Sequence, residues 1–96
     1  MKTIGVLGGM SWQSSVEYYR LINQTVSNVL RASHSAELVL YSLDFGPIAR
    51  LELEERWNEF AMVLVDAAKH LERAGPDFIV LASNTAHKVA DEVQAA

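Results

Sequence analysis

The residues best suited to chemistry follow an apolar run late in the sequence. Phe78 to Ala82 is short and rich in β-forming residues, which is typical of a strand covered on both faces. Ser83, Asn84 and Thr85 come directly after it. Asn84 and Thr85 are cap-type residues, and Ala86 to Val93 has helical character. The stretch therefore predicts a strand-to-helix turn, whose free N–H groups and positive helix end suit a carboxylate or a phosphate.

A second candidate loop follows the apolar opening strand, Thr3 to Leu7. Gly8 and Gly9, followed by Met10, allow a tight turn and the close approach of a ligand to the backbone. The loop has neither the third glycine of a dinucleotide site nor the Gly-Lys-Ser/Thr of a P-loop. Because ligands bind open α/β sheets at the carboxyl ends of the strands, we expect both loops to lie at one such edge.

Composition excludes several classes of function. The chain has 96 residues, enough for one small domain. Its net charge of −4 and its scattered basic residues give no nucleic-acid footprint. It has no cysteine, which excludes disulfides and thiolate metal sites within it. No apolar run reaches the ~18 residues of a membrane span, and no signal-peptide pattern precedes the first strand, so we expect a cytoplasmic protein.

Two amphipathic helices are predicted between the strands. The first begins at Ser11 or at Ser14, whose spacing to Glu17 fits a capping box. The second occupies most of Ile48 to Ala74, and each helix is expected to bury one apolar face. The face of the first consists of Val16, Tyr19, Ile22, Val26, Val29 and Leu30; that of the second consists of Leu53, Trp57, Phe60, Leu64, Ala67, Ala68 and Leu71.

The order of elements, strand then helix three times over, predicts an α/β domain with a parallel sheet in three layers. The strands are Thr3 to Leu7, Glu37 to Leu43 and Asp77 to Ala82, and the last helix is Asn84 to Ala96. Right-handed crossovers place the first strand between the other two. Asp44 to Pro47 is expected to be a turn at the same edge as the glycine loop. Asp44 could line a site there, although a structural turn aspartate is the commoner role.

Two stretches of this sequence resemble the aspartate/glutamate racemases, within the wider aspartate/glutamate/hydantoin racemase group. Met1 to Trp12 is similar to the opening of these proteins, and Ala82 to Asp91 looks like their first catalytic motif, Cys-Asn-Thr-x-His. Tyr18 to Asn23 and Arg73 to Gly75 fit the same family. The resemblance implies that residues 1–96 form an N-terminal racemase-like α/β domain. By this resemblance we expect half of a two-domain racemase fold, with the C-terminal domain absent from these residues.

The resemblance also implies an activity, that of a cofactor-independent amino-acid racemase of the aspartate/glutamate type. Such enzymes use neither pyridoxal phosphate nor a metal. Two residues, typically cysteines, face opposite sides of the α-carbon; one removes the α-proton and the other returns a proton. By motif position Ser83 stands where the first cysteine would be. Asn84 and Thr85 would then hold the carboxylate or amino group of the substrate, and Gly9 with Met10 would close the site.

The departure from the family pattern is chemical. This chain has neither catalytic cysteine, and an unassisted serine hydroxyl is too weak an acid to replace one, so we expect the isolated chain to be inactive. Some family members do carry a hydroxyl residue at the first position and keep the second cysteine. His87, one turn into the last helix, fits a structural role and a site role equally.

The expected partners are a small acidic amino acid or a dicarboxylate, with neither nucleic acid nor membrane. Unpaired sheet edges favour a homo-oligomer. Two further hypotheses remain open. One is a truncated or non-catalytic carboxylate-binding remnant, and the other is a homodimer whose two copies complete one another.

Overall fold

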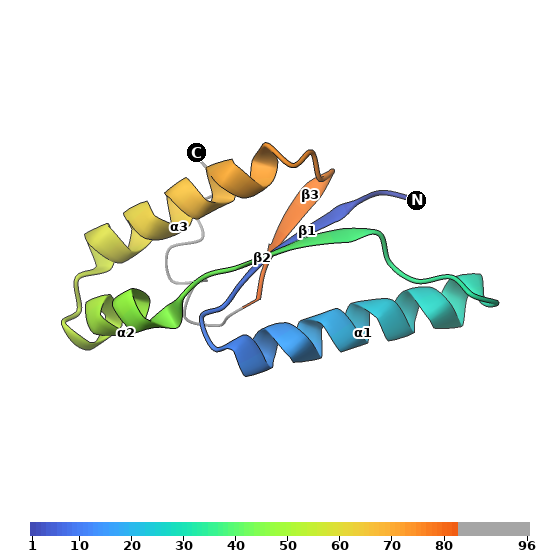
Figure 1. The fold of residues 1–96 in the computed structure, drawn as a ribbon, viewed down its shortest axis with the longest axis horizontal. Helices are drawn as coiled ribbons and strands as arrows, with labels where there is room; N and C mark the ends of the chain where they lie inside the picture. Colours follow the sequence, from blue (N-terminus) through green and yellow to red (C-terminus); the bar gives the residue numbers. More distant parts are fainter. Residues whose placement is uncertain (83–96) are drawn as a thin grey trace.

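The computed structural model describes residues 1–82, which form an α/β unit of three strands and three helices (Figure 1). In chain order the elements are β1 (Ile4–Gly8), α1 (Trp12–Leu30), β2 (Leu38–Ser42), α2 (Phe45–Leu53), α3 (Trp57–Glu72) and β3 (Phe78–Leu81). The predicted last helix, from Asn84, lies outside the described residues. Within residues 1–82 no helix is long and apolar enough to cross a membrane.

The sheet has the predicted topology. Its strand order is β2-β1-β3 and both pairings are parallel, so β1 lies in the middle. Val6 of β1 is in register with Leu40 of β2 on one side and with Val80 of β3 on the other. The α/β class and the central place of the first strand are therefore confirmed.

The main hydrophobic core lies between the sheet and α3. Phe60, Leu64 and Leu71 of α3 are fully buried, as is Leu7 of β1. Burying a side chain of this size stabilises the fold by about 1.5–3 kcal/mol. Figure 1 shows α1 on one side of the sheet, with α2 and α3 together on the other. This core fixes β1, and with it the start of the loop that follows β1.

The buried face predicted for α1 is largely wrong. The buried residue of α1 is Ser15, whereas most of the predicted apolar face is exposed or half-buried. The exposed members are Val16, Tyr19, Val29 and Leu30; Ile22 and Val26 are half-buried. Among the residues of α1, the small Ser15 is the one that lies against the end of β1, at Gly8.

The single helix predicted between Ile48 and Ala74 is two helices, α2 and α3, joined by a corner at residues 54–56. Glu55 has a φ of 54°, in the left-handed region that ends a helix, and the N–H of Arg56 donates to the carbonyl of Leu51. Leu53 is 85 % exposed instead of buried. The predicted buried stripe is confirmed in α3, where its members are buried apart from the half-buried Trp57.

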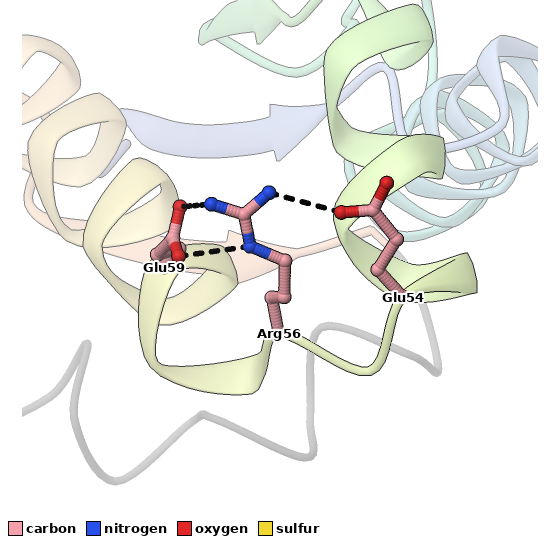
Figure 2. A network of polar contacts seen from close by, with 3 residues as sticks. All are labelled: Glu54, Arg56 and Glu59. Atoms are coloured by element: carbon pink, nitrogen blue, oxygen red, sulfur yellow. Dashed lines mark hydrogen bonds and ion pairs between the residues drawn. The ribbon is translucent and has the colours of Figure 1, made fainter.

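An ion-pair network spans this corner (Figure 2). The Arg56 guanidinium donates to both carboxylate oxygens of Glu59 and, at 2.9 Å from Nη1, to Oε1 of Glu54. The hydrogen bonds to Glu59 first, and then to Glu54, raise the pKa of Arg56 above its ordinary value. The network therefore links the end of α2 to the first turn of α3.

Candidate functional site

The segments that follow the three strands meet at one edge of the sheet. The carbonyl of Gly8, the last residue of β1, accepts a 2.9 Å hydrogen bond from the N–H of Leu43, just after β2. The carbonyl of Leu7 accepts one of the same length from the N–H of Ala82, just after β3. Ala82 is fully buried and immediately precedes Ser83 in the sequence. The carboxyl ends of the strands are thus joined around the glycine loop.

Gly9 adopts a conformation that only glycine accommodates without strain. Its φ is 91°, and a Cβ built on it would lie 2.2 Å from the backbone nitrogen and oxygen of Leu43. Its N–H donates a 2.9 Å hydrogen bond to the hydroxyl oxygen of Ser15. The loop after β1 is therefore held from two sides, by the β2 end and by α1.

Gly8 is just as tightly enclosed. A Cβ at Gly8 would lie 2.3 Å from Oγ and 3.1 Å from Cβ of Ser15. Within residues 1–82, Ser15 is the buried polar side chain, with 3 % of its surface exposed. Ser15 was not among the candidate residues predicted from the sequence; the signal available was a small residue near the start of the helix, six positions after Gly9.

Helix α1 begins differently from the capping-box expectation. It starts at Trp12, so Ser11 is the N-cap residue and the box from Ser14 to Glu17 is wrong; the earlier start at Ser11 is confirmed. The Ser11 side chain makes no capping hydrogen bond, and its φ of 101° is uncommon for a residue other than glycine. Unusual backbone of this kind often marks functional loops, and here it continues the glycine loop.

Met10 is placed in the core. The residue as a whole is only 4 % exposed and belongs to the buried cluster that includes Ile48 and Phe60. Its predicted contact with a substrate stays a prediction.

Asp44 has a structural role, but at the start of a helix and not in the predicted turn. Residues 44–47 are not a turn but the start of α2, and Asp44 is its N-cap residue. One carboxylate oxygen accepts the N–H of Gly46 at 3.0 Å, the usual role of aspartate at a helix start. No three histidine, aspartate or glutamate side chains of residues 1–82 are grouped as a metal site requires.

The remaining predicted site residues, Ser83, Asn84, Thr85 and His87, lie outside the described residues. Gly9 and Met10 are the predicted site residues that the structure places, on the loop after β1. The described part of the candidate site is therefore the glycine loop, the start of α1 and the ends of β2 and β3.

These features define an open parallel α/β domain with a rigid glycine loop at the carboxyl edge of its sheet, the usual ligand-binding position of such domains. A family model described as Asp/Glu/Hydantoin racemase matches residues 7–96. The chain therefore belongs to the Asp/Glu/hydantoin racemase family, and the resemblance found in the sequence is confirmed.

Individual relatives agree with this assignment. A curated relative, the broad specificity amino-acid racemase RacX of Bacillus subtilis (strain 168), is 29% identical over 97% of this chain. The structure is similar to that of a candidate Asp/Glu racemase from Yersinia pestis, with 47% identity, a TM-score of 0.95 and 99% of this chain covered. It is also similar to PH1733, an aspartate racemase homologue from Pyrococcus horikoshii OT3, with 36% identity, a TM-score of 0.82 and 99% coverage. The chain spans 41% of the length of each of the three.

Proposed function

We propose that this chain forms the amino-acid-binding half of a cofactor-independent racemase that acts on aspartate or glutamate. The observation that carries the proposal is the match of residues 7–96 to the racemase family, combined with the rigid loop at Gly9. RacX is named as an amino-acid racemase and the Pyrococcus protein as an aspartate racemase homologue, which supports an amino acid as the ligand.

In this proposal the two loops hold the substrate and Ser83 faces its α-carbon. The α-proton of an amino acid is a very weak acid, so the site must stabilise a carbanion-like transition state with donors already in place. The glycine loop supports such preorganisation because Gly9 is held by both Ser15 and Leu43. Asn84 and Thr85 supply the polar side chains that bind the carboxylate or the amino group.

The proposed reaction also needs a base that removes the α-proton, and the chain lacks the cysteine that would serve. A thiol titrates near pH ~8.5 and its surroundings can lower that value, so a cysteine thiolate can accept a proton near neutral pH. The 96 residues contain no cysteine, and a second copy of the same chain would bring none. We therefore propose that the chain by itself binds the amino acid without turnover, and that a thiol base belongs to polypeptide other than these residues.

Two measurements on the 96-residue chain test the proposal. Titration with L-aspartate or L-glutamate, followed by NMR, is expected to shift the amide signals of Gly9 and Ala82. L-lysine serves as the control for the acidic side chain. Incubation of L- and D-aspartate in deuterated water is expected to give no exchange at the α-carbon.

Each result has a distinct meaning. Absence of any shift with both acidic amino acids would contradict the binding role. Equal shifts with L-lysine would contradict acidic specificity alone. Deuterium incorporation at the α-carbon would contradict the need for an external thiol and would make the chain itself a catalyst.

A further inference from the structure

Ser15 occupies an unusual place for a serine in an amphipathic helix. Its hydroxyl is buried at the point where α1 meets the end of β1, and it accepts the N–H of Gly9 at 2.9 Å. A serine at an interior helix position ordinarily contributes little to stability, because its hydroxyl competes with the helix for backbone groups. Here the hydroxyl reaches out of the helix and binds the loop after the strand.

The contact between Ser15 and the loop depends on the glycines. Because Gly8 lacks a Cβ, the Ser15 hydroxyl can occupy the space where that atom would lie, 2.3 Å away. On its other side Gly9 is packed against the Leu43 backbone, which leaves the loop little freedom. The position of the loop is therefore set by one side-chain hydrogen bond and one backbone contact.

The geometry points to Ser15 as a positioning residue for the candidate amino-acid site. It does not touch the ligand; it fixes the Gly9 backbone, and so the loop that the ligand meets. This inference rests on the proposed function, because it assigns Ser15 to the same site. A loop already fixed before binding loses less conformational freedom when the ligand arrives, which favours affinity.

The test compares Ser15→Ala, which removes the hydroxyl, with a matched control in the 96-residue chain. Ser27→Ala makes the same change at a half-buried position near the far end of α1. The first readout is hydrogen exchange at the Gly9 amide, and the second is the dissociation constant for L-aspartate, both measured by NMR.

We expect Ser15→Ala to speed exchange of the Gly9 amide by roughly two- to tenfold, the range that corresponds to one typical hydrogen bond. It should weaken L-aspartate binding by a similar factor. Ser27→Ala should change neither value. The Gly9 amide reports on the hydrogen bond whether or not a ligand is present.

The outcomes separate this inference from the proposed function. Unchanged Gly9 exchange in Ser15→Ala would overturn it, and so would faster exchange with unchanged affinity, because Ser15 would then be a packing residue only. Failure of the unmodified chain to bind any acidic amino acid would instead contradict the proposed function. This binding measurement is made first, before any variant is prepared.

Discussion

Replacement of Gly9 by alanine should destabilise the chain strongly, although it adds only one methyl group. The residue has a φ of 91°, which costs an L-residue free energy wherever it occurs. In addition, the new methyl group would lie 2.2 Å from both the nitrogen and the oxygen of the Leu43 backbone. Backbone atoms cannot rotate away as a side chain can, so the end of β2 would have to move.

The expected loss of unfolding free energy in Gly9→Ala is the sum of two parts. The left-handed conformation costs about 1–2 kcal/mol for a residue with a Cβ. Overpacking in an enclosed position typically adds about 1–3 kcal/mol. We therefore expect Gly9→Ala to lower the free energy of unfolding by about 2–5 kcal/mol. A domain of this size has roughly 5–14 kcal/mol in total, so a large part of its stability would be lost.

Gly75→Ala is the matched control. Gly75 has a similar φ of 83°, but a Cβ there would meet nothing within 4 Å. Gly75→Ala should therefore lower the free energy of unfolding only by the cost of the left-handed conformation, about 1–2 kcal/mol. Urea unfolding followed by circular dichroism gives both values by linear extrapolation, and their difference isolates the contact with Leu43.

The result that would refute this reasoning is equal destabilisation by the two variants. The close approach of Gly9 to Leu43 would then not exist in solution, and the loop would be free to relax. A Gly9→Ala chain that remains as stable as the parent would contradict both parts together. Ligand binding by such a chain would also contradict the rigid-loop basis of the proposed function.

Three further predictions concern stability, and thermal or urea unfolding checks each of them. Phe60→Ala should lower the free energy of unfolding by about 3–5 kcal/mol, because Phe60 is fully buried in the core. The control Met62→Ala, at an exposed position of the same helix, should change it by less than about 0.5 kcal/mol. Similar losses in the two variants would contradict the observed core. Asp44→Ala should cost about 1 kcal/mol through loss of the α2 cap, and Asp44→Asn, which keeps a capping oxygen, should cost less. Arg56→Ala should lower the free energy of unfolding only slightly, and high salt should reduce the loss, because the ion-pair network is exposed. Because the pKa of Arg56 is raised in the folded state, its contribution is fully present below the unfolded-state pKa and is lost only as the pH rises through the higher folded-state pKa. No shift of the unfolding midpoint from Arg56 is therefore expected near neutral pH.

Local pattern in the sequence was enough to predict the architecture. Alternating strand and helix signals, with right-handed crossovers, lead to three parallel strands with the first in the middle. The glycine pair after the opening strand and the motif at Ser83 to Thr85 were sufficient to indicate the racemase family. These features were accessible because each depends on neighbouring residues and on general rules of chain connection.

Some outcomes could not be read from the sequence because they depend on contacts between distant residues. The apolar residues at Leu53 and Trp57 are four apart, so their spacing hides the corner between α2 and α3. The apolar residues of α1 have helical spacing whether or not the sheet covers them, and the sheet leaves Val16 and Tyr19 exposed.

The candidate site shows the same division. The sequence by itself determined which residues stand in the glycine loop and that the chain carries no thiol. Only the tertiary structure decided that Met10 is enclosed in the core, that Asp44 caps a helix, and that the Ser15 hydroxyl binds Gly9. The physical reason is that burial and hydrogen bonding are set by what packs against a residue, and here the partners come from separate strands and helices.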